Sequence, residues 1–280
     1  MTTLVLGATS LVGRFLVPGA QQAGQAVISL GRKAAGHDHI QADLTDPGLA
    51  AQLPELDLVY ACAPIWLLPN ALEALADRGM RRLIAFSSTS RFTKATSPHA
   101  VERDVADKLA RAEEALLAFC QSKDIGWTIL RPTLIYAEGQ DQNISRLAHL
   151  IQRLGVLPIA GAGMGKRQPV HAADLAAAAI RASQTDLALN KAYDLPGGET
   201  LTYRAMAERV FIGLGRKPRI VSIPLSLWQA GLWLASPLLP GATGAMGARM
   251  AEDLVFDTSA AKADLDWQPR GFAPQFDQAQ

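Results

Sequence analysis

The stretch that decides the fold is Gly7-Ala8-Thr9-Ser10-Leu11-Val12-Gly13, which follows an apolar run at Thr3–Leu6 and opens a helical apolar pattern at Leu11–Ala23. A tight glycine-rich turn between a strand and a helix brings backbone N–H groups and the positive end of the helix against a diphosphate. Gly7 permits the turn, and Gly13 lets the helix pack closely on the strand. The stretch predicts a diphosphate-binding turn with candidate contacts at Gly7, Thr9, Ser10, Leu11, Val12 and Gly13.

The rest of the first half alternates β-rich runs with amphipathic helical runs. Strands are expected at Thr3–Leu6, Ala26–Leu30, Leu56–Ala61, Leu83–Ser87 and Trp127–Leu130. Helices are expected at Leu11–Ala23, Leu68–Arg78 and Ala100–Ser122. This order predicts βαβ units and a parallel sheet with helices on both faces. The fold class is therefore α/β, a Rossmann-type doubly wound parallel sheet.

The pattern changes after Arg131-Pro132. The stretch Gly155–Gly165 is predicted to be a glycine-rich loop, followed by helices at Leu175–Ala182 and Thr202–Phe211 and strands at Lys191–Leu195 and Arg219–Ile223. We expect an NAD(P)-binding Rossmann domain over residues 1–135, with segments around 166–195 returning to it. Residues 136–280 are expected to form a smaller, mixed α/β C-terminal lobe for substrate or partner binding.

Composition excludes several classes of protein. The 280 residues are 49% hydrophobic and 19% charged, with 27 basic residues against 26 acidic ones, which argues against disorder and against a nucleic-acid partner. Cys62 and Cys120 have no partner at metal-ligand spacing, so neither a metal site nor a disulfide framework is expected. The N-terminus has no basic region before an apolar core, and we expect a cytoplasmic protein.

The sequence allows two roles for one apolar segment, Ile223–Pro240. Pro224, Gln229 and Pro237 interrupt it, so no transmembrane span is predicted. A buried helix is favoured, and a face for a protein partner or a membrane surface is the alternative.

The end of the second predicted strand bears on the choice of cofactor. NAD sites usually place a carboxylate there for the ribose hydroxyls. This chain has Gly31-Arg32-Lys33 instead, and two cations suit a 2′-phosphate, so NADP is favoured over NAD. The alternative is that both are solvated surface cations. Further cofactor candidates near strand ends are Asp43, Leu44, Ala61, Pro132 and Thr133.

The chain resembles the NAD-dependent epimerase/dehydratase family, the extended and atypical branch of the short-chain dehydrogenase/reductases. The resemblance rests on the glycine turn and on the motifs Leu130-Arg-Pro-Thr-Leu-Ile-Tyr136, Arg167-Gln-Pro-Val-His-Ala-Ala-Asp174 and Pro196-Gly-Gly-Glu-Thr200. It covers residues 1 to about 225. It implies a nicotinamide cofactor and a hydroxylated substrate such as a sugar nucleotide.

The resemblance also implies a catalytic set that this sequence matches only in part. The family uses Tyr-xxx-Lys on a helix and a hydroxyl at the end of the fifth strand. Lys108 matches the family's lysine, which also contacts the cofactor, and Ser88 or Thr89 matches the hydroxyl. The position of the tyrosine, four residues before Lys108, is occupied by Asp104. None of the four tyrosines, Tyr60, Tyr136, Tyr193 and Tyr203, precedes a lysine by four. Asp104 is a candidate acid or base, and an i,i+4 surface ion pair is the alternative.

Two further positions depend on the resemblance. Ser10 stands where this group usually has glycine, and it either donates a hydrogen bond to the phosphates or holds the cofactor slightly back. Related sugar-nucleotide enzymes contact a substrate diphosphate through residues that match Arg167 and Asn143. A basic loop in water is the alternative for Arg167.

Two hypotheses of function follow. The leading one is an NADP-preferring oxidoreductase, epimerase or dehydratase that acts on a sugar nucleotide or a related small molecule. The alternative is a non-catalytic dinucleotide-binding protein that serves as a redox sensor, regulator or assembly factor, with a protein partner or as a homodimer. The missing tyrosine and the apolar Trp228–Leu239 segment favour the alternative.

Overall fold

The computed structural model describes residues 2–32, 38–228, 247 and 249–276. It divides into two compact units. Unit 1 comprises Met1–Thr133, Ala172–Leu195 and Asp257–Gln268, and unit 2 comprises Leu134–His171, Pro196–Phe256 and Pro269–Gln280. Lys33 and the part of the apolar segment from residue 229 to 240 lie outside the described residues. Among the residues that are described, no helix has the length and apolar character needed to cross a membrane.

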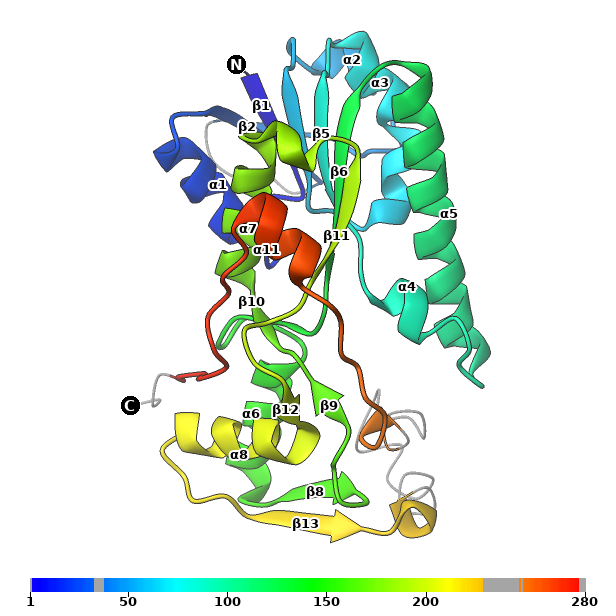
Figure 1. Cartoon of the computed structure of the whole chain (residues 1–280). Coiled ribbons are helices and arrows are strands. Elements are labelled where there is room, and N and C mark those ends of the chain that lie inside the picture. Colours follow the sequence, from blue (N-terminus) through cyan, green and yellow to red (C-terminus); the bar gives the residue numbers. More distant parts are fainter. Residues whose placement is uncertain (1, 33–37, 229–246, 248, 277–280) are drawn as a thin grey trace. The chain divides into compact units, whose positions relative to one another are not determined.

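Unit 1 contains a seven-stranded parallel sheet in the order β11-β6-β5-β4-β1-β2-β3 (Figure 1). The strands are β1 (Thr2–Leu6), β2 (Ala26–Gly31), β3 (His39–Gln41), β4 (Leu58–Ala61), β5 (Arg82–Phe86), β6 (Gly126–Pro132) and β11 (Lys191–Leu195). The central strands are buried along almost their whole length, as expected for strands covered on both faces. The order reverses between β1 and β4, and ligands of open α/β sheets bind at such a point.

Helices cover both faces of this sheet, which confirms the doubly wound α/β class (Figure 1). One face packs against α2 (Leu49–Gln52), the 3-10 helix η1 (Ile65–Asn70), α3 (Leu72–Asp77) and α5 (Ala100–Ser122). The other carries α1 (Gly13–Gln22), α7 (Ala172–Ser183) and α11 (Ser259–Leu265). Two short helices, α4 (Ser90–Thr93) and the 3-10 helix η2 (Asp186–Ala188), complete the unit. The single helix predicted at Leu68–Arg78 is divided between the end of η1, which contains Pro69, and α3.

Unit 2 is a smaller mixed α/β body whose described residues form three two-stranded sheets. These pair β7 (Ile135–Tyr136) with β10 (Val170–His171), β9 (Lys166–Arg167) with β12 (Leu201–Thr202), and β8 (Leu157–Ala160) with β13 (Ile220–Ile223). Helices α6 (Ile144–Leu154) and α8 (Tyr203–Gly213) share a core with them. The prediction of a loop throughout Gly155–Gly165 is wrong, because Leu157–Ala160 pairs with β13 and buries Leu157, Ile159 and Ala160.

Candidate functional site

The β1–α1 turn has the backbone geometry of an anion-binding loop. Gly7 has φ +78°, and a Cβ there would lie 2.7 Å from the Ala63 nitrogen. A Cβ at Gly13 would lie 2.4 Å from the Gly7 carbonyl oxygen. The Gly7 N–H donates to Leu30 O at 3.0 Å, which ties the turn to the end of β2. Only glycine fits at both positions, and the turn is held at the point where the strand order reverses.

The amide hydrogens of this turn are available to a ligand. The N–H groups of Thr9, Leu11 and Val12 have no acceptor among the described residues. Ser10 Oγ accepts the Gly13 N–H at 3.1 Å, and Ser10 O accepts the Arg14 N–H at 3.1 Å. Ser10 therefore closes the first turn of α1 and occupies one amide that a phosphate would otherwise meet. The orphan donors and the glycine cradle fit the diphosphate of a nicotinamide dinucleotide.

A cation that sequence reasoning missed lies next to the turn. Arg14 Nε donates to Thr9 O at 3.2 Å, so its side chain folds back over the loop. The signal was present in the sequence, because Arg14 directly follows the last glycine of the motif. A guanidinium here adds positive charge at the end of the helix where an anion binds.

The adenosine end of the predicted site has no carboxylate at the end of β2. Arg32 is exposed, and its carbonyl accepts from Gln41 Nε2 at 3.2 Å. Asp43 is also exposed, and its Oδ1 accepts the Thr45 N–H at 2.9 Å and the Thr45 hydroxyl at 2.8 Å. These hydrogen bonds hold the pKa of Asp43 below its usual value. The ionised carboxylate of Asp43 therefore stabilises the turn between Asp43 and Thr45.

The remaining cofactor candidates occupy strand ends or the core. Ala61 ends β4 beside Leu6 of β1. Leu44 is buried in the core under the sheet. Pro132 ends β6, and the N–H of Thr133 donates to Leu195 O at 3.4 Å. Ala61 is thus at the same carboxyl edge as the glycine turn, whereas the Leu44 side chain contacts the core.

The predicted acid–base pair, Asp104 and Lys108, lies on α5 and faces solvent. Lys108 Nζ lies 2.8 Å from Asp104 Oδ2, and the two side chains are 55% and 58% exposed. The buried face of α5 is formed by Ala106, Leu109, Ala112, Glu113, Leu116 and Cys120. Lys108 and Asp104 therefore contact each other, on a face of α5 that does not pack against the sheet.

The hydroxyls after β5 are held in a turn. The Thr89 hydroxyl and N–H both donate to Pro132 O at 3.1 Å, and Thr89 is buried. Ser88 Oγ accepts the Ser90 N–H at 3.1 Å, and its own proton has no acceptor among the residues that the structure describes. Ser88 is half-buried at the carboxyl end of the sheet. Ser88 is therefore the hydroxyl of this pair that a ligand can use.

The four tyrosines lie in other elements. Burial raises the pKa of the Tyr60, Tyr193 and Tyr203 hydroxyls. Tyr60 Oη lies 2.7 Å from Ser183 Oγ, and Tyr193 Oη donates to Asp264 Oδ2 at 2.7 Å. Tyr136 is buried in unit 2, edge-on to Phe272 at 5.0 Å.

A buried charged cluster lies beside Ser87. Glu113 is 1% exposed and accepts Ser87 Oγ at 2.5 Å and Arg131 Nη2 at 2.6 Å. It also pairs with Arg91. Burial alone would raise the pKa of Glu113, but the hydrogen bonds from Arg131 and Ser87 outweigh it, so the pKa is lowered. Sequence reasoning missed this cluster, because its members come from four separate elements.

The two predicted substrate contacts have structural partners in unit 2. The buried guanidinium of Arg167 donates from Nη1 to Lys166 O and Glu252 O at 2.7 Å each and from Nη2 to Arg249 O. Asn143 Nδ2 donates to Ile135 O at 3.1 Å at the start of α6. Within the described part of the chain, the Arg167 guanidinium thus donates its hydrogen bonds to backbone carbonyl groups.

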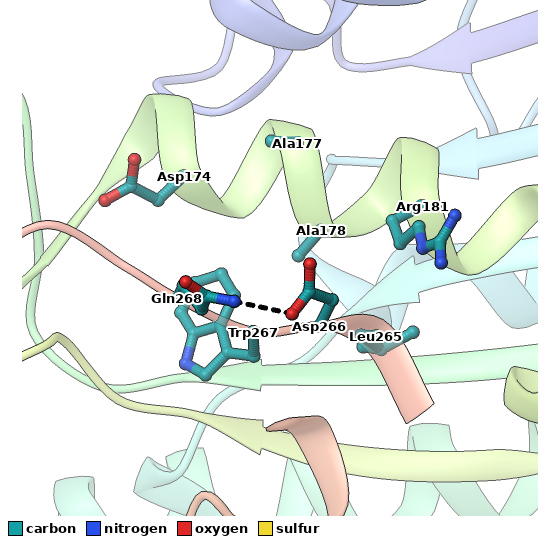
Figure 2. A pocket seen from close by; sticks show the side chains of 8 residues that line it. All are labelled: Asp174, Ala177, Ala178, Arg181, Leu265, Asp266, Trp267 and Gln268. Atoms are coloured by element: carbon teal, nitrogen blue, oxygen red, sulfur yellow. Dashed lines mark hydrogen bonds between the residues drawn. The ribbon is translucent and has the colours of Figure 1, made fainter. Parts of the chain in front are cut away.

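A separate hollow of about 410 Å³ lies between α7 and the end of α11 in unit 1. Figure 2 shows its walls, with Gln268 Nε2 donating to Asp266 Oδ1 at 2.6 Å. None of the predicted cofactor or catalytic residues lines it. Its lining residues are Asp174, Ala177, Ala178, Arg181, Leu265, Asp266, Trp267 and Gln268.

Residues 67–195 match the model of the NAD dependent epimerase/dehydratase family. The matched residues make up slightly less than half of the chain. The chain is 33% identical over 123 residues to the mitochondrial NADH dehydrogenase [ubiquinone] 1 alpha subcomplex subunit 9 of Arabidopsis thaliana, over 43% of this chain and 29% of that protein. It is 23% identical over 211 residues to a UDP-glucose 4-epimerase of Vibrio cholerae, over 71% of this chain and 62% of the epimerase.

The fold is that of solved sugar-nucleotide epimerases. The UDP-glucuronic acid 4-epimerase of Bacillus cereus, solved with UDP-glucuronic acid and NAD, superposes with a TM-score of 0.73 at 16% identity. The superposition covers 98% of this chain and 95% of the epimerase. At that identity the likeness shows the fold, a Rossmann-type α/β sheet with a smaller C-terminal body.

Proposed function

We propose that this protein binds a nicotinamide dinucleotide at the β1–α1 turn and keeps it as a regulatory or structural ligand, without the tyrosine-based hydride chemistry of the matched family. It would act as a redox sensor, regulator or assembly factor. The observation that carries this proposal is the exposed Asp104–Lys108 pair on α5, at the place where the family pattern has tyrosine and lysine.

The acid–base argument supports a binding role. A catalytic phenol needs a lowered pKa near a cation. The pKa of Tyr60, Tyr193 and Tyr203 is raised by burial instead. Asp104 is more than half exposed, which removes the desolvation that would make a carboxylate a base near neutral pH. The named role of the Arabidopsis relative, a subunit of an assembly, agrees with a binding function.

The dinucleotide is proposed to lie with its diphosphate on the amides of Thr9, Leu11 and Val12 and its adenosine ribose near Arg32. The absence of a carboxylate at the end of β2 favours NADP over NAD. When bound, the nicotinamide supplies a ring that can exist oxidised or reduced. The chain's own residues supply the anion cradle and the neighbouring cation.

Titration calorimetry with NAD⁺, NADH, NADP⁺ and NADPH tests the proposal. At least one of the four is expected to bind, with unchanged absorbance of the reduced nicotinamide when UDP-sugars are added. Absence of heat with all four would refute binding. Substrate-dependent oxidation of the cofactor would refute the non-catalytic role.

A second candidate, an epimerase or reductase acting on a sugar nucleotide, is favoured by Ser88. Its hydroxyl proton has no acceptor in the described part of the chain, and it lies at the carboxyl end of β5, where a substrate oxygen would lie. The test is turnover with a panel of UDP-sugars, compared between the wild type and Ser88→Ala. Loss of a measured turnover in Ser88→Ala, with cofactor affinity unchanged, would support this candidate.

A further inference from the structure

Positive charge is concentrated in unit 2. The whole chain has 27 basic and 26 acidic residues, yet two long stretches of unit 2, residues 142–171 and 209–251, contain no Asp or Glu. These stretches contain four and five Lys or Arg residues, respectively. A protein surface with such a one-sided charge attracts an anionic partner.

Four of these cations lie at one end of unit 2. Arg216 Nη1 donates to Ile151 O and Gln152 O at 3.1 Å each, so the loop after α8 lies against the last turn of α6. The Leu157 N–H donates to Arg219 O at 2.8 Å, at the point where β8 and β13 begin to run side by side (Figure 1). We call the resulting group of four exposed cations the basic end, and its members are Arg153, Arg216, Lys217 and Arg219.

Three members of the basic end have solvated charges. The side chains of Arg153, Lys217 and Arg219 make no hydrogen bond or ion pair with the residues that the structure describes. Arg216 differs, because its guanidinium is held by two backbone carbonyls of α6. Each solvated cation that reaches an anionic lipid surface raises the affinity for that surface by about fivefold.

Exposed aliphatic side chains lie on the same segments as these cations. Leu154 directly follows Arg153 and is 50% exposed, and Val221 of β13 is 51% exposed. Leu225 and Leu227, which follow β13, are also exposed. Cations interleaved with aliphatic groups are typical of a surface that lies on a membrane, because the cations meet the headgroups while the aliphatic groups enter the acyl boundary. This mixture favours a lipid surface over an acidic peptide.

We propose that the basic end and the neighbouring aliphatic side chains dock this protein on an anionic phospholipid surface. The association is peripheral and reversible, with the cations on headgroup phosphates and Leu154, Val221, Leu225 and Leu227 at the acyl boundary. This inference goes beyond the proposed function, because the glycine turn belongs to unit 1 and the basic end belongs to unit 2.

Flotation of the full chain with lipid vesicles tests this inference. Vesicles of phosphatidylcholine are compared with vesicles in which about one third of the lipid is phosphatidylglycerol. The wild type is expected to float with the anionic vesicles and to bind the neutral vesicles at least about tenfold more weakly. Most of the binding is expected to be lost at about 0.5 M NaCl, because salt screens the attraction between the cations and the headgroups.

Two double variants test the residues of the docking surface. Lys217→Glu with Arg219→Glu is expected to weaken binding to anionic vesicles at least about thirtyfold, because two attractive charges are lost. Leu225→Ser with Leu227→Ser is expected to weaken it about tenfold, because less apolar surface leaves water. Arg111→Glu with Lys262→Glu is the matched control, since it reverses two exposed cations of unit 1, and its binding is expected to stay within about twofold of the wild type. Circular dichroism checks that each variant is folded.

Several results would overturn the inference. No binding to vesicles, equal binding to neutral and anionic vesicles, or equal losses in the test and control variants would each refute docking by the basic end. Capture by polyglutamate without vesicle binding would assign this face to an acidic protein. A dimer in solution that the test variants dissociate, again without vesicle binding, would assign it to a second copy of the chain. If a variant does not fold, the dependence of wild-type binding on anionic lipid and on salt still decides.

Discussion

Lys108 Nζ lies 2.8 Å from Asp104 Oδ2 on the exposed side of α5. The two residues are four apart, so they stack on one face of the helix, and that face is not the one packed against the sheet. A pair that resembles half of a catalytic motif thus forms an exposed i,i+4 ion pair.

This relationship predicts the outcome of restoring the family motif. Asp104→Tyr is expected to give no reductase or epimerase activity with UDP-sugars, because a phenol there would be solvated. Lys108→Ala is expected to change the free energy of unfolding by less than about 0.5 kcal/mol. Cofactor-dependent turnover by Asp104→Tyr, measured by nicotinamide absorbance, would show that α5 presents this face to the substrate.

Gly7→Ala is expected to abolish dinucleotide binding and to lower the free energy of unfolding by about 3 kcal/mol, since a Cβ there meets backbone as well as an unfavourable φ. Gly24→Ala is the matched control. Gly24 has φ +80° but nothing within 4 Å of its Cβ, so only the backbone term of about 1 kcal/mol is expected. Calorimetry and urea unfolding measure both effects. Equal losses in the two variants would contradict the close approach at Gly7.

Ser10→Gly tests the hydroxyl in the phosphate turn. The substitution frees the Gly13 N–H that Ser10 Oγ now accepts, so dinucleotide affinity is expected to rise about threefold. Stability is expected to fall by only a few tenths of a kcal/mol, because glycine is a tolerated helix cap. A weaker dinucleotide complex would instead indicate that the Ser10 hydroxyl donates to the phosphates.

The buried carboxylate of Glu113 is expected to make the free energy of unfolding depend on pH. Its pKa in the folded protein is below the usual value of 4.5, so its contribution is fully present above about pH 4.5 and is lost as the pH falls through the folded pKa. Glu113→Gln is expected to cost about 3 kcal/mol at neutral pH, because it leaves Arg91 and Arg131 without their shared carboxylate. Urea unfolding of both proteins from pH 7 to pH 3 checks this. A wild-type stability that stays level over that range would contradict it.

Arg167→Ala distinguishes a structural arginine from a substrate contact. The loss of its hydrogen bonds to three carbonyls is expected to lower the stability of unit 2 by about 2 kcal/mol, with unchanged affinity for UDP. Arg153→Ala, an exposed arginine at the end of α6, is the control. A selective loss of UDP affinity in Arg167→Ala would place this residue in a ligand site.

Sequence patterns predicted most of the sheet and less of the site. The central strands and the turn at Gly7 follow from local signals, namely apolar runs and glycines at fixed spacing. The strand at Leu157–Ala160 was missed because glycines surround it and its partner, β13, lies some sixty residues later. The pairings of Glu113 with Arg91 and Arg131 have no local signal at all.

What the amino-acid sequence alone determined is the class of fold and the glycine turn between β1 and α1, because the signals for strand, turn and helix lie in neighbouring residues. Only the tertiary structure decided which side chains meet. It paired Lys108 with Asp104 in water, engaged Arg167 with carbonyls and set Arg216 against the last turn of α6, since such contacts depend on the packing of elements far apart in the chain.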